Sequence, residues 1–291
     1  MHRYLLHNEE IRDTTERLLM PGQVGFLNGW GVFSTIRVAD GVLFAFDRHY
    51  RRMRYDAERM HVPFNFPEAE MERALLSLVA ANQARNATLR VAIVRSRGGL
   101  FEAPGLTRDA DMVAFMADLN PWGDGVKLSY KANARYGASP FAGAKITSWA
   151  QNLTWYEEAH QQGFDEFILL NEKGQISECT SANIFAVHKD NVFTPPLVMS
   201  GCLPGITRAV LLEEIQVAGL SISERELTPA DLENSDQVFI TSTTRDLLPV
   251  LEIDHKPLKQ APSILAVLRE AFLTYRANYV TSRRSDKIAA A

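Results

Sequence analysis

The chain of 291 residues is 46% hydrophobic and 23% charged, a composition typical of a globular protein whose length suggests two domains. Its formal net charge of −4 and pI of about 6.0 argue against non-specific binding to nucleic acid, which requires a basic surface. Two cysteines without a repeated metal spacing, and no apolar run long enough for a leader or a membrane span, predict a cytoplasmic, metal-free protein.

Residues 1–118 are predicted to form a small N-terminal α+β domain. The expected elements are strands at 32–38, 42–46, 88–96 and 110–118 and helices at 48–60 and 67–83. An Ala-Asp-Gly turn joins the first two strands as a hairpin, and Asp47 is the expected N-cap of the first helix. The glycines at 25, 29 and 31 either let the backbone approach a ligand closely or form a simple loop.

Turn-forming residues at 119–125 predict a linker, and 126–291 are predicted to form a larger C-terminal domain. The expected strands cover 126–132, 166–170, 176–187, 191–196, 221–227 and a segment from 237, with a final hairpin after it. The expected helices cover 149–162, 207–219, a short helix capped by Thr228, and 264–283.

The stretch 174–208 contains an acid and a helix start in close order. Glu178 lies among apolar residues of a predicted strand, and a Pro-Gly turn opens a helix whose first residues are Ile206 and Thr207. Free N–H groups at a helix N-terminus bind anions. The buried Glu178 should face a cation, which is either a basic nitrogen of a cofactor or an arginine of the protein. The hydroxyls at 241–244 are either turn caps or phosphate contacts.

Lys145 and Arg52 are the two basic residues whose surroundings differ from those of their neighbours. Lys145 lies between small residues and an apolar helix, where a desolvated amine can form a Schiff base, although a half-buried lysine can also snorkel to solvent. Arg52 borders the buried face of its helix, where a guanidinium can bind a phosphate with two hydrogen bonds. The sequence has no dinucleotide-binding, P-loop, nucleophile-elbow or zinc-protease motif, so no other chemistry competes.

The chain resembles the class IV, or fold type IV, pyridoxal 5′-phosphate (PLP) enzymes. This family includes branched-chain aminotransferases, D-amino acid aminotransferases and 4-amino-4-deoxychorismate lyases. The resemblance covers nearly the whole chain and follows the family's order: GFLNGWGVFSTIRVADG, HYRRM, Lys145, ISECTSANIF, LPGITR and VFITSTTRDLLPV. It implies a two-domain α+β and α/β fold, with a small N-terminal α+β domain and a larger C-terminal domain with a β-barrel-like core, in a homodimer.

The resemblance also implies roles for individual residues. Lys145 corresponds to the lysine that holds the cofactor and moves a proton between the substrate Cα and the cofactor C4′. Glu178 corresponds to the acid that keeps the pyridine nitrogen protonated. The implied phosphate contacts are Arg52, Ile206, Thr207 and Thr243, and Leu203 packs against the ring. The implied substrate contacts are Phe33, Arg95, Arg97 and Thr244.

Two positions depart from the family pattern. Ser34 follows Phe33 where many of these aminotransferases have a glutamate, and Ala150 occupies a position where branched-chain enzymes place a tyrosine near the cofactor's phenolic oxygen. Phe33 cannot supply that hydroxyl either.

Three functional hypotheses follow. The first is a PLP-dependent aminotransferase that moves an amino group between an amino acid, of the branched-chain class, and a 2-oxo acid such as 2-oxoglutarate. The second is a 4-amino-4-deoxychorismate lyase that releases pyruvate and 4-aminobenzoate. The third is a ligand-binding module without catalysis. The expected partners are therefore small molecules and a second copy of the chain.

Overall fold

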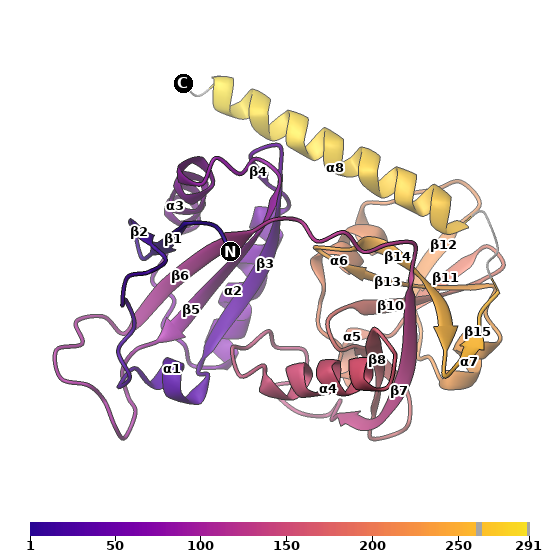
Figure 1. Ribbon diagram of the computed structural model, residues 1–291. Helices are drawn as coiled ribbons and strands as arrows, with labels where there is room; N and C mark the ends of the chain where they lie inside the picture. The colour runs from indigo at the N-terminus through magenta and orange to yellow at the C-terminus, as the bar shows by residue number, and fades with distance from the viewer. Residues whose placement is uncertain (260–263, 290–291) are drawn as a thin grey trace. The chain divides into compact units, whose positions relative to one another are not determined.

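The structure of the protein is a computed structural model that describes residues 1–259 and 264–289 (Figure 1). The chain divides into two compact units. Unit 1 comprises Met1–Asn120, Ala144–Trp149 and Asn278–Ala291, and unit 2 comprises Pro121–Gly143 and Ala150–Ala277. The six residues Ala144–Trp149 therefore pack with unit 1, although unit 2 contains the chain on both sides of them.

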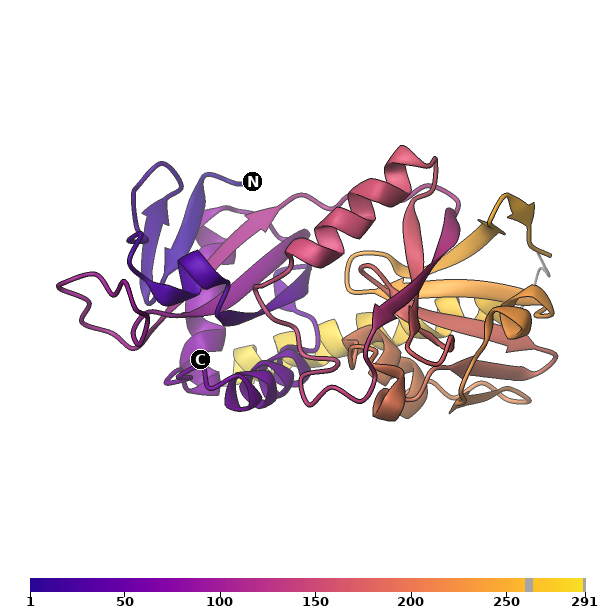
Figure 2. The ribbon, with the colours of Figure 1, turned by 90° about the horizontal axis from the view of Figure 1, so that it is seen from below.

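Unit 1 contains an antiparallel six-stranded sheet of order β2-β1-β6-β5-β3-β4. Its strands are β1 (Tyr4–His7), β2 (Glu10–Asp13), β3 (Gly31–Ala39), β4 (Val42–Leu43), β5 (Ala87–Arg95) and β6 (Ala110–Ala117). Its helices are α1 (Val24–Asn28), α2 (Phe46–Arg59) and α3 (Glu68–Ala81). Figure 2 shows this unit from below, with the sheet and its helices in indigo and purple.

The side chains of β3 alternate between the two faces of the sheet, and this alternation decides which of them face α2. Successive side chains of a strand point to opposite faces, and Val32, Ser34 and Ile36 are all buried on the face that packs against α2. The core on this face joins the strands to Met53 of α2 and to the apolar residues of α3. Phe33 points to the other face of the sheet. One strand therefore presents a hydroxyl to α2 and an aromatic ring to the opposite side.

Two sequence-based boundaries in unit 1 are wrong. The strand predicted at 42–46 ends at Leu43, because Ala45 adopts a left-handed conformation with φ of 53° that an extended strand cannot contain. Helix α2 consequently begins at Phe46 with Ala45 as its N-cap, so Asp47 lies inside the first turn. There its carboxylate accepts a hydrogen bond from Arg51, one turn later.

Unit 2 contains a curled nine-stranded sheet of order β12-β11-β10-β13-β14-β7-β8-β9, with β15 paired to β14 (Figure 1). Three pairs, β7 with β8, β7 with β14 and β11 with β12, are parallel, and the others are antiparallel. The strands are β7 (Val126–Arg135), β8 (Glu166–Asn171), β9 (Ile176–Cys179), β10 (Asn183–His188), β11 (Asn191–Thr194), β12 (Ser221–Glu224), β13 (Gln237–Ser242), β14 (Asp246–Ile253) and β15 (Lys256–Pro257). This half barrel confirms the expected fold class.

The helices of unit 2 are α4 (Ala150–Gln161), α5 (Leu197–Ser200), α6 (Ile206–Glu213) and α7 (Pro229–Glu233), and α8 (Ile264–Ala289) contributes residues to both units. The predicted cap of α7 is confirmed, because the Thr228 hydroxyl accepts the N–H of Asp231. The helix predicted to run to Gly219 is wrong in length: α6 ends at Glu213, and a turn closed by the Leu220 N–H and the Val217 carbonyl replaces its last part. Among the described helices, none has the length and apolarity to span a bilayer.

Candidate active site

The segment that carries Lys145 is hydrogen-bonded to the start of β3 in unit 1. The Phe33 N–H donates to the Lys145 carbonyl at 3.0 Å, and the Thr147 N–H donates to the Gly31 carbonyl at 2.9 Å. The Thr147 hydroxyl adds a hydrogen bond to the Gly29 carbonyl at 2.7 Å. The lysine backbone is therefore held against a rigid strand, as a precise catalytic site requires.

Gly31 makes this close approach possible. A Cβ at this position would lie 2.6 Å from the Ile93 carbonyl oxygen and 2.9 Å from the Thr147 hydroxyl, both too close for a side chain. The sequence leaves open whether the glycines before β3 admit a ligand or form a simple loop. At Gly31 the neighbours that require glycine are the β5 backbone at Ile93 and Thr147 of the lysine-bearing segment.

The side chain of Lys145 lies between two aromatic rings. Its Nζ is 4.6 Å from the ring centroid of Phe33 and 4.8 Å from that of Trp149, and the two rings meet edge to face. The guanidinium of Arg90, on β5, lies 4.7 Å from the same Phe33 ring. Cation–π contacts of this kind attract an ammonium group to the face of a ring. The amine is thus placed beside apolar surface, which suits a nucleophilic lysine.

Helix α2 presents His49, Arg52 and Asp56 on one buried face, against Ser34 of β3. The Ser34 hydroxyl accepts a hydrogen bond from Arg52 Nη2 at 2.8 Å and lies 2.7 Å from His49 Nδ1. Burial lowers the pKa of Arg52 to about 10. Burial, together with the charges of Arg52 and Lys145, also lowers the pKa of His49 well below its usual value. His49 is therefore neutral at neutral pH.

This cluster fits the phosphate of the predicted cofactor. A buried guanidinium is stabilised by a nearby anion, which replaces interactions that burial has taken away. The backbone N–H of Lys145 donates to Asp56 Oδ2 at 3.1 Å, and Asp56 lies one helical turn after Arg52. The two predicted cofactor residues of unit 1, Lys145 and Arg52, are therefore connected through α2.

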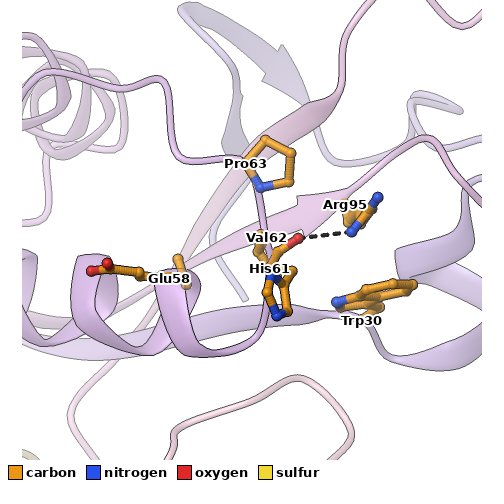
Figure 3. A pocket seen from close by; sticks show the side chains of 7 residues that line it. Trp30, Glu58, His61, Val62, Pro63 and Arg95 are labelled. Carbon is orange, nitrogen blue, oxygen red and sulfur yellow. Dashed lines mark hydrogen bonds between the residues drawn. The ribbon is translucent and has the colours of Figure 1, made fainter.

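Arg95 and Arg97 lie at a different place in unit 1. The Arg95 guanidinium lies 4.2 Å from the Trp30 ring centroid, and it donates to the carbonyls of His61 at 2.8 Å and Arg97 at 2.9 Å (Figure 3). These contacts close one side of an open cavity of about 650 Å³. Arg97, which is half exposed, pairs with Glu102 at 3.3 Å. The structure does not bring either arginine to Lys145 by any hydrogen bond among the described residues, and their substrate role stays a prediction.

Glu178 is buried in unit 2 and its carboxylate has two partners. Arg135, at the end of β7, donates to Oε1 through Nε and Nη2, each at 3.2 Å. The backbone N–H of Leu203 donates to Oε2 at 3.0 Å. An arginine of the protein, one of the two cations left open by the sequence, therefore pairs with Glu178. The two contacts also place the strand of Glu178 beside the turn that contains Leu203.

The start of α6 is open to an anion. Gly205 precedes Ile206 and Thr207 as the N-cap residue, no side chain caps the helix, and no acidic residue occupies its first turn. Asn183, the asparagine of the ISExxxxNxF motif, donates to the Leu203 carbonyl at 2.8 Å. A Cβ on residue 205 would lie 2.0 Å from the Asn183 side-chain oxygen, so only glycine fits there. Asn183 thus fixes the turn that presents the helix start.

Thr243 and Thr244 lie in the turn between β13 and β14, and a buried ion pair supports that turn. Arg245 is paired with Glu166 and also donates to the Ser181 hydroxyl at 2.9 Å. Glu166 accepts from the Ser181 N–H at 2.8 Å as well. Because Ser181 follows β9, the ion pair connects the turn of Thr243 and Thr244 to the strand that carries Glu178.

Sequence reasoning missed five residues that hold the predicted ones in place: Asp56, Trp149, Arg135, Asn183 and Arg245. Asp56 has a local signal, because it lies four residues after Arg52 and so on the same helix face. Asn183 is part of a recognised motif. Arg135 has no local signal, since its partner lies 43 residues away.

Metal and thiol chemistry find no support in the part of the chain that the structure describes. Those residues contain no group of three or more His, Cys, Asp or Glu side chains that could hold a metal. Cys179 and Cys202 are buried free thiols, and burial raises the pKa of Cys202 to about 11 and that of Cys179 well above its usual value. Neither thiol is therefore an activated nucleophile.

Comparison with known proteins identifies the family. The model of the class IV amino-transferase family matches residues 31–253. A Methanocaldococcus jannaschii protein, provisionally named a branched-chain-amino-acid aminotransferase, is 30% identical over 88% of this chain and 90% of its own. The D-alanine aminotransferase of Bacillus licheniformis is 28% identical over 86% of this chain and 88% of its own. The branched-chain amino acid aminotransferase of Escherichia coli has the same fold, with a TM-score of 0.85, 24% identity and 95% of both chains covered. The chain belongs to the class IV aminotransferase family.

Proposed function

We propose that this aminotransferase moves an amino group between an amino acid, of the branched-chain class, and a 2-oxo acid such as 2-oxoglutarate. The observation that carries the proposal is the network of unit 1 in which Lys145, between two aromatic rings, is hydrogen-bonded to the helix that presents the buried Arg52. Together they supply an amine for a carbonyl group and a guanidinium for a phosphate, which are the two ends of PLP.

Pyridoxal 5′-phosphate is the cofactor of this enzyme, and when bound it accepts the electrons released at the substrate Cα. The residues we assign to it by their match to the family motifs are Arg52, Lys145, Glu178, Leu203, Ile206, Thr207 and Thr243. Glu178 would accept a hydrogen bond from a protonated pyridine nitrogen and so keep that nitrogen protonated, and its contacts with Arg135 and the Leu203 N–H hold its carboxylate in one orientation. The open start of α6 offers N–H groups to the phosphate.

Lys145 carries the catalytic role in the proposal. With the cofactor bound, the Lys145 amine would hold it covalently at its carbonyl carbon, and when released it would carry a proton between the substrate Cα and the cofactor C4′. The aromatic surfaces of Phe33 and Trp149 limit water around the amine.

The substrate contacts we assign are Phe33, Arg95, Arg97 and Thr244, and the geometry adds Arg90 to them. The Arg90 guanidinium and the Lys145 amine both lie on the Phe33 ring, and therefore within about 10 Å of each other. A substrate whose amino group reaches Lys145 can extend a second carboxylate towards Arg90. This favours a dicarboxylic partner such as 2-oxoglutarate, because an arginine binds a carboxylate through two hydrogen bonds.

A homodimer is part of the proposal. Unit 1 exposes Phe26 and Leu27 on α1, and Leu100 and Phe101 on the loop after β5 are 92% and 77% exposed. Apolar side chains at that exposure are typical of protein interfaces. The cytoplasmic location proposed from the sequence agrees with two thiols that remain free and buried.

The half-reaction with one substrate tests this function. PLP-loaded protein is mixed with L-leucine or L-glutamate in the absence of a 2-oxo acid, and the absorbance spectrum is followed. A transaminase loses the visible band of the bound cofactor and gains a near-ultraviolet one, because the amino group stays on the cofactor. A parallel sample receives D-alanine, which tests stereochemistry. Formation of pyruvate from 4-amino-4-deoxychorismate, with no spectral change for any amino acid, would instead establish the lyase.

A further inference from the structure

Asp56 is a buried carboxylate to which the family motifs assign no role. Its side chain is 1% exposed, and burial raises its pKa. Oδ2 accepts the backbone N–H of Lys145 at 3.1 Å, while Oδ1 lies 3.7 Å from Arg59 Nη1. Burying a carboxylate is costly, and a carboxylate that accepts a backbone hydrogen bond holds that backbone firmly. The contact therefore joins two segments that are 89 residues apart in the chain.

The position of Asp56 on α2 relates its hydrogen bond with Lys145 to the position of Arg52. Asp56 lies four residues after Arg52 on the same face of one helix, an axial offset of about 6 Å. A helix of this kind is rigid over one turn. The backbone of Lys145 is thus held at a constant offset along α2 from the guanidinium of Arg52.

We propose that Asp56 is a positioning residue that sets the distance between the reactive lysine and the phosphate-binding arginine. This inference rests on the proposed function, in which one PLP molecule contacts Lys145 at its carbonyl end and Arg52 at its phosphate end. The hydrogen bond to the Lys145 N–H keeps the amine within reach of a carbonyl whose phosphate is already bound. Without it, the segment Ala144–Trp149 keeps its hydrogen bonds to β3 but loses this hydrogen bond to α2.

Three variants test the inference. Asp56→Ala removes the acceptor, Asp56→Asn keeps an acceptor oxygen at the same place, and Asp47→Ala removes a carboxylate from the exposed side of the same helix as a matched control. Each apoprotein is saturated with PLP and reduced with borohydride. Samples are reduced at successive times after PLP is added, and peptide mass spectrometry of each sample gives the rate at which the adduct forms at Lys145. Equilibrium dialysis against PLP, without reductant, gives the total affinity.

We expect Asp56→Ala to lower the rate of adduct formation at Lys145 by about 10-fold or more, because the lost contact is a charge-assisted hydrogen bond. Asp56→Asn should return to within about 3-fold of the wild type, and Asp47→Ala should match it. If Asp56→Asn restores the rate, the hydrogen bond positions Lys145 and the negative charge of Asp56 is not required. Far-UV circular dichroism of each variant verifies that α2 and its unit remain folded.

Two outcomes overturn the inference. One is an Asp56→Ala protein that forms the Lys145 adduct at the wild-type rate. The other is a folded Asp56→Asn protein that forms the adduct about 10-fold or more slowly than the wild type. This result needs no folded Asp56→Ala protein, and it excludes the hydrogen bond as the contact that positions Lys145. A wild-type protein that forms no adduct at Lys145 is a separate result, since it rejects the proposed function itself.

Discussion

In unit 2 the buried carboxylates Glu166 and Glu178 are each paired with an arginine. In unit 1 the buried Arg52 hydrogen-bonds to the Ser34 hydroxyl, and the charge of Asp56 partly offsets the lowering of its pKa by burial. The nearby Lys145 amine and Arg90 guanidinium lie against the aromatic ring of Phe33. A buried carboxylate that is paired with a close arginine already has its counter-charge. A guanidinium or ammonium group that contacts a hydroxyl or an aromatic ring can also bind an anion.

This difference suggests that the charged residues of the two units have different roles. The ion pairs of unit 2 hold backbone turns in place, since Glu178 contacts the Leu203 N–H and Glu166 contacts the Ser181 N–H. We propose that the cations of unit 1 instead bind negative groups of small molecules. If so, breaking a pair in unit 2 should mainly lower stability, and removing a cation contact in unit 1 should mainly lower binding.

The largest effect is expected for Glu166→Gln in unit 2. Glu166 and Arg245 are 0% and 4% exposed, so the variant leaves a buried guanidinium without its counter-charge. The free energy of unfolding should fall by about 3–5 kcal/mol, as measured by chemical denaturation. The control is Glu158→Gln, which breaks the half-exposed Lys131–Glu158 pair of the same unit and should cost less than about 1 kcal/mol. Equal losses in the two variants would contradict a special role for the buried pair.

Arg90→Gln should produce a binding effect of intermediate size in unit 1. The KM for 2-oxoglutarate should rise about 10- to 100-fold, because the second carboxylate loses a charge-assisted contact. The KM for the monocarboxylic 4-methyl-2-oxopentanoate should stay within about 2-fold, and the free energy of unfolding within about 0.5 kcal/mol. Arg108→Gln, which removes an exposed partner of Glu9, is the control. A parallel rise in both KM values would refute Arg90 as the contact for the second carboxylate.

The smallest effect is expected for Ser34→Ala. This change removes the hydroxyl that accepts a hydrogen bond from Arg52 and contacts His49. The affinity for PLP should fall by about 1–2 kcal/mol, as measured by equilibrium dialysis, because Arg52 loses one of its orienting contacts. Ser77→Ala, on the exposed side of α3, serves as the control. An unchanged PLP affinity in Ser34→Ala would show that the hydroxyl does not orient the arginine.

Local patterns predicted much of the fold. The alternation of β3, the capping box at Thr228 and the Pro-Gly turn before α6 are all encoded within a few residues. The errors are also local: a left-handed Ala45 ends a strand that its apolar neighbours favour, and α6 stops before the glycine expected to end it. Backbone conformations of this kind depend on packing that a single segment does not determine.

The supporting contacts of the site could not be predicted from local sequence. Arg135 meets Glu178 across 43 residues, and Asp56 meets Lys145 across 89. The site residues themselves were proposed from motifs, and their assignment to the cofactor stays a prediction. The positions at which this chain departs from the family, such as Ser34, gain a physical explanation only from their contacts: a small hydroxyl fits between His49 and Arg52.

The most direct test of the central claim is the site of covalent attachment of PLP. Purified protein is incubated with PLP, reduced with borohydride and digested, and the labelled peptide is identified by mass spectrometry. The account predicts a yellow protein and a single reduced adduct on Lys145, absent from Lys145→Ala. An adduct on another lysine, such as Lys131 or Lys173, or stoichiometric PLP binding that survives Lys145→Ala with catalysis intact, would contradict it.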